Sequence, residues 1–516
     1  MEELNKETGN VQQNAGQVNN QAENVGEIVN KNGETAIANL EQELTQKASD
    51  LEAQRSSREQ QLVTLTLNRI AGGVVPKEAE INTLIEATKG KCQNPLKEIV
   101  MREIIRSADD HLWCPEYVQR SGSDQRVVVF TGSYWEPVEP QQWTDFVRLC
   151  AEKCGMPESM LMNHNFMNLL SEATAFQLAK YRRQVIPNGE VWLNLRNATL
   201  VIKSDGTVAL HEHNKNDLFF YCLPYSYDPQ AECPQWHAFL DRVLPEQDAQ
   251  RLLAEYIGYC LMKDHSIEKM LLLYGEGLNG KSVTLEIIEA LLGQMNVSYM
   301  SLADLTNDDV KRAAIVGKML NISHESGKDV NPNVLKQLTS GERVTVRRLY
   351  HNPVETNDYG KLVAAFNVLP RAENTFGFFR RLIFLPYLVT IPKEEIDRLL
   401  AVKLKTELPG ILGWVLEMLP GLMARREFSP CESSDKALEQ YRLQSDNVRL
   451  FLNEACEVSD YTTQASEIFT AYRTFCINSS LKPVSRNKFY DRLEKLGHER
   501  VTYSGTLYFK LKLTEQ

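Results

Sequence analysis

One short stretch of this chain restricts its fold more than any other part of the sequence. A continuous apolar run, Lys269–Tyr274, leads directly into Gly275-Glu-Gly-Leu-Asn-Gly-Lys-Ser282, and a helical pattern follows over Val283–Leu292. This is the phosphate-binding P-loop pattern, G-x-x-x-x-G-K-[ST], in the strand–loop–helix order that it requires. The apolar run is typical of a strand buried on both faces, as in a parallel sheet.

The residue types of the loop suit a nucleoside triphosphate. Its glycines let successive backbone N–H groups curl around a β-phosphate at the positive end of the following helix. Lys281 would reach the β- and γ-phosphates, and Ser282 would offer its hydroxyl to Mg²⁺. We therefore predict ATP and Mg²⁺ as cofactors. The predicted ATP-binding residues are Gly275, Glu276, Gly277, Leu278, Asn279, Gly280, Lys281, Ser282 and Val283.

Two later strands end in side chains that phosphoryl transfer needs. The next buried run, Met319–Ser323, ends in His324-Glu325. We predict that this strand neighbours the P-loop strand, so that Glu325 serves Mg²⁺ and the attacking water at the carboxyl edge of the sheet. The run Leu362–Phe366 ends in Asn367, whose amide would hold that water or the γ-phosphate. The alternatives are a solvated strand-end acid and a turn-forming asparagine.

Two adjacent arginines directly precede a fourth buried run, Leu382–Leu385. An arginine in this place can complete a neighbouring subunit's site as a finger that stabilises charge on the transferred phosphoryl group. A surface salt-bridge pair is the alternative. The predicted catalytic residues are Lys281, Glu325, Asn367, Arg380 and Arg381, with Ser282 and Glu325 as metal ligands.

Buried strands that alternate with helical segments indicate an α/β domain with a largely parallel sheet. Upstream of it, an expected helix over His164–Tyr181 and several short strands indicate an α+β or helical domain. Near the C-terminus, two predicted helices and a hairpin, Arg500–Tyr503 with Thr506–Leu513, follow the order of a winged helix. The predicted domains are 61–233 before the core, a helical collar at 234–265, the core at 266–425 and the winged helix at 440–516.

The first 60 residues differ in composition from the rest, with eleven acids against five bases. Apolar residues such as Ile37, Leu40 and Leu44 follow the heptad spacing of a coiled coil, but interspersed glycines weaken it. A polar tail and a weak coiled coil both remain open.

Charge and cysteine content exclude several classes of protein. The net charge of −11 excludes a uniformly basic nucleic-acid coat, although a local basic channel is compatible with it. None of the ten cysteines forms a C-x-x-C pair, so a zinc ribbon is not expected, and Cys150 and Cys154 are predicted to pack in a core. The polar start and the lack of a long apolar run predict a cytoplasmic protein with no membrane partner.

Taken together, the core motifs resemble superfamily 3 helicases of the phage, plasmid and poxvirus primase–helicase group. The resemblance covers roughly residues 125–420, and His324 departs from it, because many members carry a second acid there. The motifs that carry it are Asn279 in the loop, the strand ending in Glu325, Leu335–Glu342 with Val346–Tyr350, Gly360–Leu362 leading to Asn367-x-Leu-Pro370, the arginine pair, and upstream Trp192–Arg196 and Tyr227–Trp236.

The resemblance implies an AAA+ core that assembles as a homo-oligomeric ring, usually a hexamer, and moves 3′ to 5′ on single-stranded DNA. Its role would be replication of a phage, plasmid or other mobile element in the cytoplasm of a bacterial host. Family members often carry a primase, but no D-x-D strand is visible here, so a separate primase is the expected source of primers. The alternatives are an AAA+ loader or remodelling ATPase, and a DNA-binding initiator or repressor without processive unwinding.

Two segments are locally basic and are candidates for contact with single-stranded and forked DNA. Residues 336–381 and residues 480–516 each hold eight Lys or Arg against four acids. Cations meet phosphates, and an aromatic ring can stack on a base. A solvated hairpin and a protein-docking winged helix are the respective alternatives. The candidate DNA-binding residues are Lys336, Arg347, Arg348, Tyr350, His351, Arg486, Lys488 and Arg492.

Overall fold

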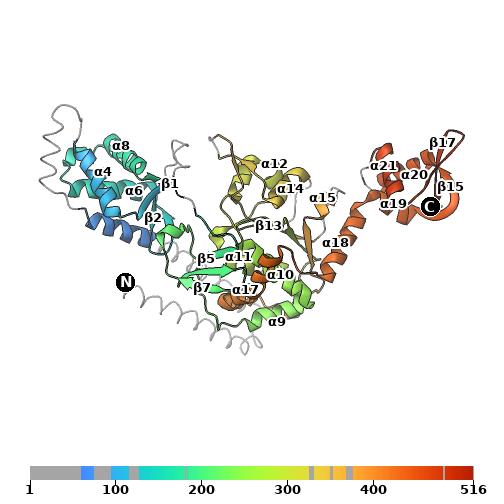
Figure 1. Cartoon of the computed structure of the whole chain (residues 1–516), viewed down its shortest axis with the longest axis horizontal. Coiled ribbons are helices and arrows are strands. Elements are labelled where there is room, and N and C mark those ends of the chain that lie inside the picture. Colours follow the sequence, from blue (N-terminus) through green and yellow to red (C-terminus); the bar gives the residue numbers. More distant parts are fainter. Residues whose placement is uncertain are drawn as a thin grey trace. The chain divides into compact units, whose positions relative to one another are not determined.

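The computed structural model of the chain is shown in Figure 1. It describes residues 60–74, 95–115, 127–180, 182, 184–324, 330–348, 352–367, 376–479, 481 and 483–514. Three candidate site residues, Glu325, Tyr350 and His351, lie outside these ranges, as does the predicted tail before residue 60. The chain divides into two compact units, one of Met1–Val201 with Val208–Tyr227 and one of Ile202–Thr207 with Asp228–Gln516.

The first unit combines a helical cluster with two small sheets of strand orders β3-β2-β1-β4 and β5-β6-β7. Cys150 and Cys154 are buried in its apolar core as predicted, and burial raises the pKa of Cys150 to about 12. Its elements are a helical stretch at 60–72, α4 (Pro95–Ala108), β1 (Leu112–Pro115), β2 (Val128–Phe130), β3 (Trp135–Pro137), α6 (Pro140–Lys153), α7 (Glu158–Leu161), α8 (His164–Gln177), β4 (Ala179–Lys180), β5 (Glu190–Asn194), β6 (Thr199–Lys203) and β7 (Val208–His211).

The helix expected over His164–Tyr181 was predicted too long. Helix α8 ends at Gln177, and the next residues form β4, which pairs in parallel with β1. The N–H of Cys114 donates to the carbonyl of Leu178 at 3.2 Å, so pairing with a strand distant in sequence sets this boundary. Tertiary contacts of this kind override weak helix propensity.

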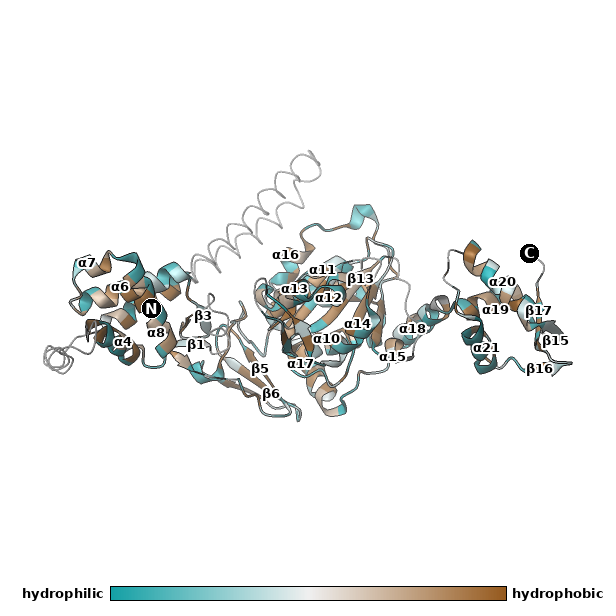
Figure 2. Ribbon diagram, turned by 90° about the horizontal axis from the view of Figure 1, so that it is seen from above, coloured by the Kyte–Doolittle hydropathy of each residue, from teal (hydrophilic) through white to brown (hydrophobic). Residues whose placement is uncertain are grey.

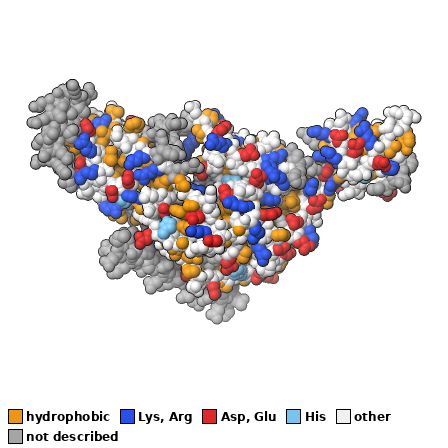
Figure 3. All heavy atoms as spheres, viewed as in Figure 1, with side chains coloured by type: hydrophobic (Ala, Val, Ile, Leu, Met, Phe, Trp, Pro, Cys, Tyr) orange, Lys and Arg blue, Asp and Glu red, His pale blue; other side chains and the backbone are white. Residues whose placement is uncertain are grey.

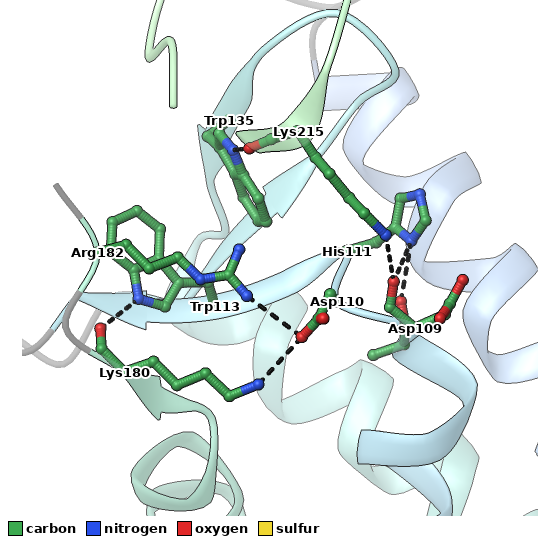
Figure 4. Close-up of polar contacts among 9 residues, drawn as sticks. Asp109, Asp110, His111, Trp113, Trp135, Lys180, Arg182 and Lys215 are labelled. Atoms are coloured by element: carbon green, nitrogen blue, oxygen red, sulfur yellow. Dashed lines mark hydrogen bonds and ion pairs between the residues drawn. The ribbon is translucent and has the colours of Figure 1, made fainter. Parts of the chain in front are cut away.

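A cation shared by two indole rings and a carboxylate links the strands of this unit (Figure 4). The Arg182 guanidinium lies 5.7 Å from the ring centroid of Trp113 and 5.6 Å from that of Trp135. It also contacts the carboxylate of Asp110 at 3.2 Å. A hydrogen bond from Lys180 is the main reason why the pKa of Asp110 lies below its usual value. Because both cations are paired, we interpret the cluster as a structural link.

A five-stranded parallel sheet forms the centre of the second unit, as the sequence predicts. Its strand order is β14-β8-β13-β10-β9, and each neighbouring pair is parallel. The sheet is mostly buried and forms an apolar centre, brown in Figure 2. The strands are β8 (Met270–Tyr274), β9 (Val297–Ser298), β10 (Leu320–His324), β13 (Lys361–Phe366) and β14 (Leu382–Pro386).

The strand order corrects one expectation from the sequence. We expected the strand that ends at His324-Glu325 to neighbour the strand before the glycine-rich loop. Instead, β8 pairs with β13 and β14, and β13 lies between β8 and β10. Parallel strands need long crossover connections, so chain order does not fix which strands become neighbours.

Helices and one hairpin surround this sheet. Helix α17 is strongly apolar and packs against α10. No helix in the described ranges is both long and apolar enough to span a bilayer. The elements are α9 (Pro234–Val243), α10 (Gln247–Leu261), α11 (Lys281–Leu292), α12 (Leu302–Asn307), α13 (Asp309–Arg312), α14 (Pro332–Ser340), β11 (Val344–Val346), β12 (Val354–Thr356), α15 (Phe376–Phe379), α16 (Leu400–Lys405) and α17 (Leu408–Arg425).

The C-terminal part has its own apolar core, in which the rings of Tyr472 and Phe489 stack at a centroid distance of 4.3 Å. The two predicted helices and the predicted hairpin are present. The sequence did not predict β15, which pairs with β17 to give the strand order β15-β17-β16. The elements are α18 (Glu432–Ser445), α19 (Asn447–Ala455), β15 (Cys456–Gln464), α20 (Ala465–Asn478), α21 (Arg486–Lys495), β16 (Arg500–Tyr503) and β17 (Thr506–Leu513).

The close approach of Gly360, directly before β13, to Met319, directly before β10, gives a stability prediction. A Cβ on Gly360 would lie 2.2 Å from the carbonyl carbon of Met319. We expect Gly360→Ala to lower the free energy of unfolding of the core by about 1–3 kcal/mol, because backbone must shift. Gly413→Ala is the control, since its Cβ meets nothing within 4 Å in α17, and it should stabilise by about 0.5–1 kcal/mol. Thermal unfolding measures both, and equal midpoints would contradict the packing argument.

Candidate functional site

The glycine-rich loop, Gly275–Ser282, connects β8 to α11 in a conformation that requires glycine at several positions. Gly277 and Gly280 have φ angles of 111° and 87°, in the region that favours glycine. A Cβ on Gly275 would lie 2.2 Å from the carbonyl oxygen of Tyr387, and one on Gly280 would lie 2.9 Å from Val243 Cγ1. The loop is therefore held between the chain after β14 and helix α9.

The lysine of the loop is buried and contacts the loop's own oxygens. Lys281 Nζ donates to the carbonyl of Gly275 at 2.6 Å and to Oδ1 of Asn279 at 3.0 Å. Burial lowers the pKa of Lys281 below its usual value. Because two oxygens already stabilise its charge, a phosphate oxygen would replace them at small desolvation cost.

Asn279 links this lysine to the chain after β14. Its side chain is 4% exposed, and Nδ2 donates to the carbonyl of Tyr387 at 3.1 Å. The Tyr387 hydroxyl donates to Oγ1 of Thr284 at 3.0 Å, and Thr284 bonds the carbonyl of Gly280 at 3.1 Å. The sequence marked Asn279 only as part of the motif. Neither Tyr387 nor Thr284 carries a sequence signal, because their contact depends on how β14 packs beside the loop.

Helix α11 begins at Lys281 without a side-chain cap from Gly280. The first N–H groups of a helix lack intrahelical partners, so its N-terminus attracts anions. Ser282 lies in this first turn and is exposed, as are Glu276 and Leu278 in the loop, while Val283 is half-buried. This arrangement fits a nucleotide phosphate with Mg²⁺ on Ser282. Among the described residues, no cluster of three or more His, Cys, Asp or Glu side chains forms a metal site by itself.

The structure brings Asn367 next to the loop. Phe366 pairs with Tyr274, and the N–H of Gly275 donates to the Phe366 carbonyl at 3.2 Å, so Asn367 follows directly at the same edge. His324, the last residue of β10, pairs with Ala365, one strand further away. Its ring lies parallel to that of Tyr299 at 6.4 Å. Glu325 would follow His324 but lies outside the described residues.

The arginine pair lies at the opposite edge of the sheet from the loop. Arg381 directly precedes β14, whose first residue pairs with the first residue of β8, whereas the loop follows the last residue of β8. Five residues of strand separate the two edges by about 16 Å. Arg381 is anchored, with Nε donating to Ser340 Oγ at 2.9 Å and Nη1 donating to the Gly377 carbonyl at 2.6 Å.

The first basic segment contains an antiparallel hairpin in which β11 pairs with β12. Arg347 and Arg348 follow β11 and are exposed, and Arg347 contacts Asp309 at 3.5 Å. Lys336 lies on α14 and is half-buried. Tyr350 and His351, predicted at the end of this hairpin, lie outside the described residues.

The three candidate cations of the second basic segment lie on α21, the second predicted helix. Arg486 and Lys488 are exposed on α21, and the Arg486 guanidinium lies 5.3 Å from the ring centroid of Phe469. Arg492 is 3.7 Å from Asp446. Figure 3 shows basic and acidic side chains intermixed over the visible face of the molecule.

Comparison with known proteins gives two family matches. Residues 273–381 match a family of unknown function, DUF5906. Residues 113–245 match the family described as D5 N terminal like. The first match includes the glycine-rich loop, Asn367 and the arginine pair. The second ends between α9 and α10, upstream of the loop.

A curated relative and solved structures give weaker similarities. A putative helicase, L207/L206, of Acanthamoeba polyphaga mimivirus is 24% identical over 197 residues, which are 35% of this chain and 20% of the viral protein. The chain thus matches only a fifth of that protein's length. Two apo structures of the NrS-1 C terminal region cover 80% of this chain and 99% and 98% of their own, at 9% identity and TM-scores of 0.44 and 0.45. Scores below 0.5 do not establish a shared fold.

The contacts of Asn279 predict its effect on ligand binding. Asn279→Ala leaves the Tyr387 carbonyl and the Lys281 ammonium each without one partner, so the loop loses its preformed shape. Affinity for a fluorescent ATP analogue should fall roughly 5- to 100-fold. Asn307→Ala removes an exposed asparagine of α12 that bonds the Ala303 carbonyl, and it should bind like wild type. Equal affinity in both variants would exclude a role for Asn279 in shaping the loop.

Proposed function

We propose that this chain is an ATP-dependent DNA helicase of the superfamily 3 type, which assembles as a ring and moves along single-stranded DNA, with 3′ to 5′ polarity. It would act in replication of a phage, plasmid or other mobile element, with primers made by a separate primase. The similarity of part of the chain to a viral protein named as a putative helicase, and of residues 113–245 to the D5 N terminal like family, supports this proposal.

The observation that carries the proposal is the arrangement at the carboxyl edge of the sheet. A buried lysine in a glycine-rich loop, an uncapped helix start and Asn367 on the adjacent strand all occur at this edge. Lys281 would hold the β- and γ-phosphates, and the N-terminus of α11 would stabilise their negative charge. Mg²⁺, bound by Ser282 and Glu325, would neutralise the charge that develops on the transferred phosphoryl group.

The position of the arginine pair favours a ring over a monomer. At about 16 Å from the edge that carries the loop, neither guanidinium can serve the site of its own subunit without unfolding β14. In a head-to-tail ring, the same edge would face the nucleotide of a neighbouring subunit, as a finger acting in trans requires. We therefore propose that Arg380 or Arg381 completes the neighbour's site.

Hydrolysis and unwinding can be tested together. Lys281→Ala should abolish ATPase activity and forked-duplex unwinding, and Glu325→Gln should bind ATP but hydrolyse it at least about 100-fold more slowly. Lys405→Ala, which breaks an exposed ion pair with Glu286 on α11, is the matched control and should retain both activities. Wild-type turnover in Glu325→Gln would remove that residue from the catalytic set. Hydrolysis without strand displacement by the wild-type ring would favour a loader.

The hairpin arginines should couple hydrolysis to DNA. In an Arg347→Ala/Arg348→Ala variant, basal ATPase activity should persist, while stimulation by single-stranded DNA and unwinding fall together. The log–log salt dependence of binding should become shallower by about 0.7 per lost phosphate contact. Arg242→Ala removes one exposed arginine, paired with Glu395, and serves as the control for loss of a surface cation. Full unwinding with reduced basal hydrolysis would instead indicate that the hairpin supports the nucleotide site.

A further inference from the structure

The two adjacent arginines differ sharply in their surroundings. The side chain of Arg381 is 13% exposed and its guanidinium is fixed by Ser340 and Gly377. The side chain of Arg380 is 49% exposed. A finger must reach into another subunit, so the exposed Arg380 is the better suited of the two, and Arg381 fixes the start of β14.

One acid contacts both arginines. Glu268 Oε2 lies 2.7 Å from Arg380 Nη2 and 3.5 Å from Arg381 Nη2. Its neighbour Lys269 donates from Nζ to the Arg380 carbonyl at 2.6 Å. The side chain and the backbone of Arg380 are therefore both bonded to the two residues that precede β8.

The backbone of Glu268 is itself constrained. Its φ angle of 52° lies in the left-handed region, which non-glycine residues rarely adopt. Its N–H donates to the His265 carbonyl at 2.9 Å, closing a turn after α10. Strain of this kind persists where the surrounding structure holds it, and it often marks functional positions. The turn places the carboxylate beside the arginine that the sequence singled out.

We infer that Glu268 is a positioning residue, which holds the Arg380 guanidinium in the orientation that enters a neighbouring subunit's nucleotide site. The inference rests on the proposed function and extends it to a residue outside the recognised motifs. An exposed arginine samples many rotamers, and ordering it on assembly would cost free energy. A carboxylate bonded to Nη2 restricts these rotamers before assembly. Less free energy is then lost in ordering the side chain, so the arginine stabilises the transition state more strongly.

Replacing Glu268 should therefore lower turnover rather than nucleotide binding. Glu268→Ala should reduce kcat roughly 2- to 10-fold with KM for ATP unchanged, as expected for one side chain that loses its preset orientation. Glu268→Gln keeps an oxygen that accepts from Nη2, so its kcat should lie between those of Glu268→Ala and wild type. The matched control is Asp264→Asn, which weakens a nearby ion pair of similar exposure, with Arg426 at 2.8 Å, and should leave kcat unchanged.

Mixed rings decide which subunit carries the defect. In mixed rings of Glu268→Ala and Lys281→Ala subunits, each Glu268→Ala subunit still has an intact nucleotide-binding loop. Where its neighbour is a Lys281→Ala subunit, that loop receives an Arg380 that an intact Glu268 holds. The rate per intact loop should rise above that of Glu268→Ala rings alone. In rings of Glu268→Ala and Arg380→Ala subunits, no interface has a correctly held finger, and the rate should stay low.

The outcomes separate this inference from the proposed function. If Arg380→Ala and Lys281→Ala subunits form mixed rings without gain of activity, the finger in trans fails, and the role of Glu268 fails with it. If those rings gain activity but rings of Glu268→Ala and Lys281→Ala do not, only the positioning role is overturned. A kcat above wild type in Glu268→Ala would overturn it too, since the carboxylate would then restrain the finger. A rise in KM alone would also overturn it, since the carboxylate would then affect nucleotide binding rather than turnover.

Discussion

The pairing of β8 with β13 on one side and β14 on the other is the constraint on which both candidate regions of the core depend. Because all these strands are parallel, their carboxyl ends meet at one edge and their amino ends at the other. The glycine-rich loop and Asn367 lie at the carboxyl edge. Arg380 and Arg381 lie at the amino edge because they come before β14. The sheet thus separates the group that would hold phosphate from the group that would complete a neighbour's site.

Burial of polar groups gives the loop its shape before any ligand binds. Lys281 and Asn279 are 6% and 4% exposed, and each is bonded to backbone or side-chain oxygens. Leaving such groups unpaired would cost about 1–3 kcal/mol each, so the bonds select one loop conformation. The carbonyl of Tyr387 takes part in this selection. Since Tyr387 directly follows β14 and Arg381 directly precedes it, the same strand connects the loop to the arginine pair.

Sequence reasoning predicted the elements of the core well and their arrangement less well. The observed bounds of β8, β10, β13 and β14 lie within a residue or two of the predicted runs. Strands that are buried on both faces consist of continuous apolar residues, so they can be recognised from the sequence. It missed β9, which has two residues, and β15 in the C-terminal part. It also placed the β10 strand beside the loop strand. Strand order and short pairings depend on contacts between distant segments, which local patterns do not encode.

By itself, the sequence determined the glycine-rich loop, the strand before it and the helix after it. Glycine, lysine and serine at this spacing are typical of a single loop conformation between a strand and a helix. It also located the carboxyl ends of β8, β10, β13 and β14 to within one residue. Only the tertiary structure decided that Asn367 is adjacent to the loop while His324 is one strand further away. The tertiary structure alone also distinguished Arg380 from Arg381 and brought Glu268 to both of them. The physical reason is that these contacts join segments far apart in the sequence, 112 residues in the case of Glu268 and Arg380.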